Sequence, residues 1–272
     1  MVRHDALVPD AATFRMLPQF RERALHAANR GYISERSARA FPGDGLHERF
    51  ARALGARKAV RFKEVLEAIE FFAVVRKRVR RPVMVDLCAG HGLVGILFAM
   101  YERSVERVVL VEPTPPGNRS RVLEAAAEVA PWVPAKLELV NERVEHVSDR
   151  LVTAHPGAAL VAVHACGLLT DRAIELGTRL GGPLGLLPCC RPHSRSPAPA
   201  GLALALGADV AFDVDRTYRL ERAGYSVRWT DVPAAITPMN RVLVAWPRAD
   251  GASASGEEAR AEIRRDDRAA GG

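Results

Sequence analysis

The chain is poor in cysteine and has no long apolar segment. Only four cysteines occur in its 272 residues, and two of them are adjacent, which does not resemble the disulfide framework of a small secreted protein. No apolar run reaches the roughly 20 residues that a membrane-spanning helix needs, and the opening residues, Met-Val-Arg-His-Asp, lack the apolar stretch of a signal peptide. We therefore expect a cytoplasmic protein without a membrane partner.

Lysine is also scarce, and arginine therefore supplies almost all of the positive charge. The chain has 39 Lys and Arg against 32 Asp and Glu, a formal net charge of +7. Such an excess is compatible with attraction to RNA phosphates. An arginine-rich and alanine-rich composition can equally follow from genomic base composition, so the charge permits an RNA partner without establishing one.

What the chain does contain is a change of pattern near residue 82. Before it, apolar residues recur at spacings of three and four, which predicts helices at 11–30, 34–40, 47–54 and 62–81. After it, strand-like and helix-like segments alternate, which is typical of a doubly wound parallel sheet. The expected strands are 83–88, 107–112, 136–140, 160–165, 184–187, 225–230 and 241–246, and the later helices 92–103, 119–129, 142–153, 170–179, 201–206 and 213–222. We predict a Rossmann-like α/β core over 82–247, a helical annex over 1–81 and a disordered tail over 248–272.

A glycine-rich turn after the first core strand is the strongest functional signal. Gly90 and Gly92 carry no Cβ, so the backbone can turn tightly and approach a ligand, and the next helix offers unpaired N–H groups. The spacing Gly90-x-Gly92-x-x-Gly95 matches the dinucleotide fingerprint. A carboxylate at Asp86, however, favours a cationic cofactor over a pyrophosphate. A structural turn without a ligand is the third alternative.

The same turn resembles the first motif of class I S-adenosylmethionine (SAM) methyltransferases. That resemblance implies a seven-stranded sheet, SAM as cofactor, and cofactor contacts from Asp86, Cys88, Ala89, Gly90 and Gly92. Glu112 ends the second strand, where a carboxylate can bind both ribose hydroxyls. Asn141 and Glu142 follow the third strand, where this family usually places a polar contact to the adenine.

Three later segments refine the resemblance. The element His164-x-Cys166-Gly167-x-x-Thr170-Asp171 follows the fourth strand, Cys189-Cys190 follows the fifth, and Ile236-Thr237-Pro238-Met239-Asn240-Arg241 precedes the seventh. Together they resemble the methyltransferase domain of the tRNA acceptor-stem ribose 2′-O-methyltransferase and related methyltransferase-like proteins. The resemblance implies methylation of RNA, with a tRNA ribose hydroxyl as the finer expectation. A protein or small-molecule acceptor, a non-catalytic SAM-binding or partner-binding protein, and an NAD-dependent oxidoreductase remain alternatives.

A ribose hydroxyl must lose its proton during methyl transfer, and this requirement singles out His164. We expect His164 to act as the base beside the cofactor, with Asp171 to orient it or to hold substrate. A structural histidine is the alternative. Cys88, Cys166 and Cys189 or Cys190 should gather at one end of neighbouring strands, as packing residues, with Cys166 also a candidate nucleophile. A zinc site is a weaker alternative, and no metal ligand is predicted.

Two groups of charged residues have structural and functional interpretations. The basic residues that end the helix at 62–81 match the helix dipole, or else form an RNA-phosphate patch beside the active-site mouth; they are Arg76, Lys77, Arg78, Arg80 and Arg81. Near the C-terminal end, Asp213 and Asp215 are expected to cap a helix. Asn240 and Arg241 are expected to reach toward substrate.

Overall fold

The computed structural model describes residues 14–21, 31–188 and 198–248. Its strands are β1 (Val83–Leu87), β2 (Arg107–Val111), β3 (Leu137–Val140), β4 (Ala159–Val163), β5 (Leu184–Leu187), β6 (Tyr225–Asp231) and β7 (Arg241–Pro247). Its helices are η2 (Pro18–Phe20), α1 (Glu35–Ala38), α2 (Leu46–Arg57), α3 (Phe62–Val79), α4 (Leu93–Tyr101), α5 (Arg119–Val129), η3 (Pro134–Lys136), α6 (Val144–Ala154), α7 (Leu169–Leu180), α8 (Ala200–Leu206) and α9 (Ala208–Arg222). Every predicted strand is present.

The strands form one 7-stranded sheet in the order β3-β2-β1-β4-β5-β7-β6. Strands β1 to β5 pair in parallel, whereas β7 is antiparallel to both β5 and β6. The chain order reverses between β1 and β4, and in open α/β sheets a ligand crevice opens at the carboxyl ends of the strands at such a point. The predicted seven-stranded, Rossmann-like fold is therefore confirmed.

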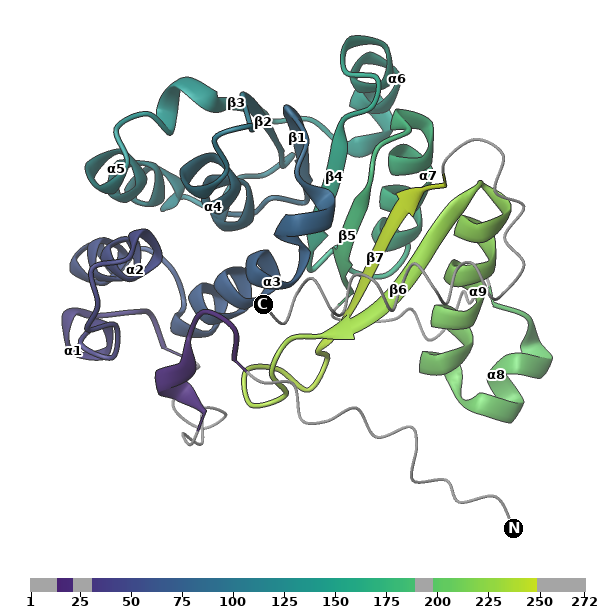
Figure 1. Cartoon of the computed structure of the whole chain (residues 1–272), viewed down its shortest axis with the longest axis horizontal. Helices are drawn as coiled ribbons and strands as arrows, with labels where there is room; N and C mark the ends of the chain where they lie inside the picture. Colours follow the sequence, from purple (N-terminus) through teal and green to yellow (C-terminus); the bar gives the residue numbers. More distant parts are fainter. Residues whose placement is uncertain (1–13, 22–30, 189–197, 249–272) are drawn as a thin grey trace.

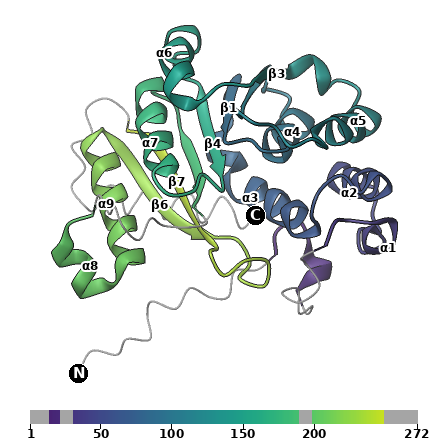
Figure 2. The same ribbon diagram turned by 180° about the vertical axis from the view of Figure 1, so that it is seen from behind.

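Helices cover both faces of the sheet, as Figures 1 and 2 show. Alternate strand residues point to opposite faces, so Met84 joins the apolar cluster that contains α3 and α4, while Val85 joins the cluster of α6 and α7. Helix α3 contacts β4, β5 and β7 as well as α4. Its first turns lie near the carboxyl ends of β1 and β4, where Glu67 contacts His164.

The predicted helix at 11–30 is wrong over residues 14–21. Instead of forming helical hydrogen bonds, the backbone N–H groups of Arg15, Met16 and Leu17 donate to the Glu70 carboxylate at 2.8, 2.9 and 2.9 Å. A single 3-10 turn follows at Pro18–Phe20. Hydrogen bonds to a buried acid on α3 thus take the place of the helical hydrogen bonds that the apolar spacing predicts.

The expected helix cap at Asp213 and Asp215 is not formed, and the predicted tail and domain boundary are not tested. Helix α9 begins at Ala208, so Asp213 and Asp215 lie inside the helix and do not cap it. The predicted tail at 248–272 lies outside the described residues except for Arg248, and the boundary between annex and core at residue 81 stays a prediction. Within the described ranges, no helix is long and apolar enough to cross a bilayer.

Candidate functional site

Two adjoining cavities lie at the carboxyl ends of β1, β2 and β4. The first, of about 280 Å³, is lined by the start of α3, the glycine turn and the end of β4. The second, of about 370 Å³, is lined by the ends of β1 and β2 and by residues 143–145. Cys88 and His164 line both cavities. Together the cavities provide a concave space of the size that small-molecule ligands occupy.

Asp86 is buried at the end of β1, beneath the glycine turn. Its Oδ2 accepts a hydrogen bond of 2.9 Å from the N–H of Gly95 in α4. Burial raises the pKa of Asp86 to about 7, against the opposing effects of the Gly95 hydrogen bond and Arg119. A carboxyl group in this state is poised to ionise when a cation binds next to it.

Glu112 lies at the other side of the same turn, directly after β2. Its Oε2 accepts from the N–H of Gly90 at 3.1 Å, and its Oε1 accepts from Thr114 at 3.2 Å. The buried Arg119 donates from Nε to the carbonyl of Gly90 at 2.8 Å. The turn is thus held from both sides, and Gly90 itself, at φ 52°, has no atom within 4 Å of where a Cβ would lie.

Backbone strain marks two residues that line both cavities. Cys88 has φ 57° and His164 has φ 62°, the left-handed region that non-glycine residues rarely adopt and that costs roughly 1–3 kcal/mol. Each follows a central parallel strand, and the N–H of His164 donates to Leu187 at 3.1 Å. Such strain is typical of ligand sites, where the surrounding structure maintains it.

His164 is held by α3. Its Nε2 lies 2.9 Å from Oε2 of Glu67, a residue whose side chain is 1% exposed. Lys63 Nζ binds the other oxygen of Glu67 at 2.7 Å. The predicted partner, Asp171, is therefore not the residue that orients His164.

A second histidine in the first cavity has a similar partner. His91 Nδ1 lies 3.2 Å from Oε2 of Glu64, and its Nε2 lies 2.9 Å from Oδ1 of Asn118. Burial lowers the pKa of His91, but the hydrogen bonds to Glu64 and Asn118 outweigh it, so the pKa is raised. Both ring nitrogens of His91 are thus engaged.

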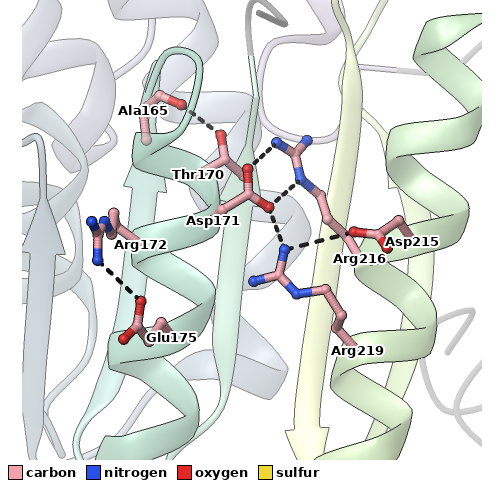
Figure 3. A network of polar contacts seen from close by, with 8 residues as sticks. All are labelled: Ala165, Thr170, Asp171, Arg172, Glu175, Asp215, Arg216 and Arg219. Atoms are coloured by element: carbon pink, nitrogen blue, oxygen red, sulfur yellow. Dashed lines mark hydrogen bonds and ion pairs between the residues drawn. The ribbon is translucent and has the colours of Figure 1, made fainter. Parts of the chain in front are cut away.

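Asp171 instead belongs to a network between α7 and α9, shown in Figure 3. Its Oδ2 lies 3.2 Å from Nη2 of Arg216, and its Oδ1 lies 2.7 Å from Nη1 of Arg219. The Arg216 side chain is fully buried, so Asp171 compensates a cation inside the protein. Among the described residues Asp171 therefore contacts two arginines of α9 and not His164, and its alternative role of holding substrate stays a prediction.

The cysteines are only partly covered by the described residues, because Cys189 and Cys190 lie outside them. Burial, with the nearby carboxylates Glu112 and Asp86, raises the pKa of the Cys88 thiol to about 12. A thiol in that state is a poor nucleophile, which favours the packing interpretation for Cys88. Cys166 is exposed in the loop before α7. Over the described residues, no group of three His, Cys, Asp or Glu side chains is placed to hold a metal ion.

The predicted adenine contacts lie beside the second cavity, not in its described lining. Glu142 pairs with Arg150 at 2.6 Å, and the described residues that line the cavity there are Arg143, Val144 and Glu145. Asn141 and Glu142 therefore stand one to two positions before the cavity wall, and their role stays a prediction.

Several other residues with predicted roles make contacts within the fold. Arg241 pairs with Asp213 at 2.5 Å, and Nδ2 of Asn240 donates to Val232 at 3.0 Å. Arg76 and Arg80 bind Glu102 at 2.6 and 3.2 Å, and the Arg78 guanidinium lies 4.5 Å from the centre of the Trp246 ring.

The basic cluster on α3 does not adjoin the cavities. The helix rises about 1.5 Å per residue, so Arg76 lies roughly 14 Å along α3 from Glu67, which lines the first cavity. Of the two interpretations of this cluster, the RNA-phosphate patch beside the active-site mouth is therefore not supported, because the cluster lies at the far end of the helix.

Sequence reasoning missed four polar residues of this site: Glu64, Glu67, Asn118 and Arg119. In the sequence, Glu64 and Glu67 stand in the first turns of α3, where acids suit the helix dipole. Their spacing of three places both on one side of α3. This spacing identifies them as site residues only when it is known which elements α3 packs against.

Comparisons with known proteins add similarity in structure only. No protein-family model and no curated protein matches the sequence. The chain is similar to an O-methyltransferase family protein from Burkholderia thailandensis, with 14% identity over 80% of this chain and 64% of that one and a TM-score of 0.42. It is also similar to the Methanococcus jannaschii fibrillarin pre-rRNA processing protein, with 15% identity over 62% of this chain and 68% of that one and a TM-score of 0.42. A third similar structure is an arsenic(III) S-adenosylmethionine methyltransferase from Chlamydomonas reinhardtii, with 13% identity over 64% of this chain and 66% of that one and a TM-score of 0.40. Identities and TM-scores this low identify neither a substrate nor a reaction for this chain, which spans 64% of the Burkholderia protein.

Proposed function

We propose that this protein is a SAM-dependent methyltransferase whose cofactor lies across the two cavities at the carboxyl ends of β1, β2 and β4. The observation that carries the proposal is the pair of carboxylates on either side of the glycine turn, Asp86 below it and Glu112 beside it. A cationic nucleoside with a ribose diol suits this pair, because one acid can face positive charge and the other can accept from hydroxyl groups.

The same turn is poorly suited to a dinucleotide. A pyrophosphate needs backbone N–H groups that point at it and are not otherwise bound. Here the N–H groups of Gly90 and Gly95 donate to Glu112 and Asp86, and that of Gly92 donates to the carbonyl of Ala89 at 2.6 Å. Two of these donors are therefore already paired with carboxyl groups.

In the proposed reaction the cofactor supplies a methyl group already activated on a sulfonium. The chain must then exclude water, align the acceptor and take up its proton, and alignment alone can supply several kcal/mol of the barrier. Asp86, Glu112 and the turn at 88–92 would hold the cofactor. His164, which lines both cavities, would take the proton.

For the acceptor we propose RNA, with a tRNA ribose hydroxyl as the finer form of the proposal. The net charge of +7 supports a polyanionic partner, and a base at His164 suits a hydroxyl that needs deprotonation. Acceptors among proteins and small molecules remain competing outcomes of the test.

The test is to incubate the full chain with methyl-labelled SAM and cell extract separated into RNA, protein and small-molecule fractions. We expect label in the RNA fraction and its loss on digestion with ribonuclease. Label confined to protein or small molecules would replace the acceptor but retain the reaction. A rise in melting temperature with NAD and none with SAM would overturn the proposal in favour of an oxidoreductase.

A further inference from the structure

The Glu67 carboxylate is buried between two donors that come from different parts of the chain. Lys63, one turn earlier on α3, binds Oε1 at 2.7 Å, and His164, after β4, binds Oε2 at 2.9 Å. Burial raises the pKa of Glu67, but the hydrogen bonds from His164 and Lys63 outweigh it and the pKa is lowered. Glu67 is thus a fixed negative charge at the wall of the first cavity.

The carboxylate determines which nitrogen of His164 carries the proton. An ionised carboxylate only accepts hydrogen bonds, so Nε2 must be the protonated nitrogen of the neutral ring. Nδ1 is then the acceptor, and it has no hydrogen-bond partner in the part of the chain that the structure describes. His91 differs, because Glu64 and Asn118 engage both of its nitrogens. Of the two histidines in the described lining of the cavity, His164 is the one with a nitrogen available as a base.

We propose that Glu67 is a positioning residue, which holds His164 in the Nε2–H tautomer so that Nδ1 accepts the proton of the methyl acceptor. This inference rests on the methyltransferase function proposed above. The acceptor's O–H proton moves to Nδ1, its oxygen forms the bond to the methyl carbon, and the electron pair of the broken carbon–sulfur bond stays on sulfur. The imidazolium that results faces the Glu67 carboxylate, which stabilises it.

The substitution Glu67→Gln makes a sharp test because Lys63 is a donor only. Lys63 would claim the amide oxygen of the variant, so the amide NH₂ would face Nε2 of His164 and force the ring into the opposite tautomer. Side-chain ¹⁵N NMR of the full chain, with the His164 signal assigned through His164→Asn, reports the tautomer without any cofactor or acceptor. We expect Nε2–H in the wild type and Nδ1–H in Glu67→Gln.

A matched control lies one turn away on the same helix. Glu64→Gln should alter the His91 signals and leave those of His164 unchanged. If the His164 tautomer is the same in Glu67→Gln as in the wild type, or if Glu64→Gln changes it equally, Glu67 does not position His164. Melting curves of all variants establish that the compared proteins are folded.

Methyl transfer provides the second readout. With label transfer measured on the fraction that accepts it, Glu67→Gln should lower kcat on the order of 100-fold or more while KM for SAM stays within about twofold of the wild type. An unchanged kcat would overturn the positioning role but not the methyltransferase function. Failure of the wild type itself to bind SAM would overturn the function, whereas the tautomer result would still decide what Glu67 does.

Discussion

Glu67 is buried and Asp171 is half-buried, and of these two acids only Glu67 contacts His164. Asp171 follows His164 by seven positions, whereas Glu67 precedes it by 97. Yet Glu67 binds the imidazole, and Asp171 binds Arg216 and Arg219 on α9. The reason is the sheet between them: α3 covers one face and α7 the other (Figures 1 and 2). Closeness in sequence does not place a side chain on the same side of a sheet.

The largest expected effect is a loss of unfolding free energy when Asp171 is replaced, because Asp171 has a structural role and Glu67 does not share it. Asp171→Asn removes the charge opposite the fully buried Arg216, and an uncompensated buried charge costs about 3–5 kcal/mol of unfolding free energy. Urea denaturation followed by circular dichroism measures it, and SAM binding by the folded fraction should persist. A stable variant that has lost SAM binding would place Asp171 in the site after all.

Asp86 differs from Asp171 because it accepts a hydrogen bond from Gly95 and has no ion pair among the described residues. Its contribution to the free energy of unfolding should therefore depend on pH. With a pKa of about 7, the folded state binds more protons than the unfolded state between pH 4 and pH 7. The free energy of unfolding should therefore fall as pH rises over that interval, by up to about 4 kcal/mol.

The variant Asp86→Asn isolates that contribution. Its amide oxygen can still accept from Gly95, but it does not titrate. Relative to the wild type it should gain stability as pH rises from 4 to 7.5, as measured by urea denaturation at each pH. Parallel pH profiles for the two proteins would show that burial does not shift the pKa of Asp86.

A smaller effect is expected at the second histidine pair. The pKa of His91 is raised in the folded protein, so the stabilisation by Glu64 is complete below pH 6.5 and is lost as pH rises through the folded pKa. Because both side chains are partly exposed, Glu64→Gln should cost only about 0.5–1 kcal/mol at pH 6. It should cost less at pH 9, and a cost that grows with pH would contradict the assigned ion pair.

The smallest effect is expected on the outer side of α7. Arg172 and Glu175 form an ion pair at 3.4 Å with side chains 52% and 56% exposed (Figure 3). Arg172→Gln should change the unfolding free energy by less than about 0.5 kcal/mol. Set against Asp171→Asn in the same denaturation experiment, this neighbouring variant tests whether burial, and not charge alone, makes the α7–α9 network important. Equal costs would refute that distinction.

The parts that could be predicted from sequence are those that short segments specify. Apolar runs fixed the seven strands, and acids at strand ends, Asp86 and Glu112, were found because strand, turn and helix are adjacent in the chain. The contact between Glu67 and His164 depends on how α3 packs on the sheet, which no local pattern records. The same limit explains residues 14–21, where the distant Glu70 takes the backbone N–H groups.

The central claim is that two carboxylates and a glycine turn at the ends of β1 and β2 bind SAM. Isothermal titration calorimetry of the wild type with SAM at pH 6 and pH 7.5 tests it most directly. We predict measurable binding that is several-fold tighter at pH 7.5, because ionised Asp86 favours the cationic cofactor, and a loss of that pH dependence in Asp86→Asn. No heat of binding at either pH, or equal binding by Asp86→Ala, would contradict the assignment.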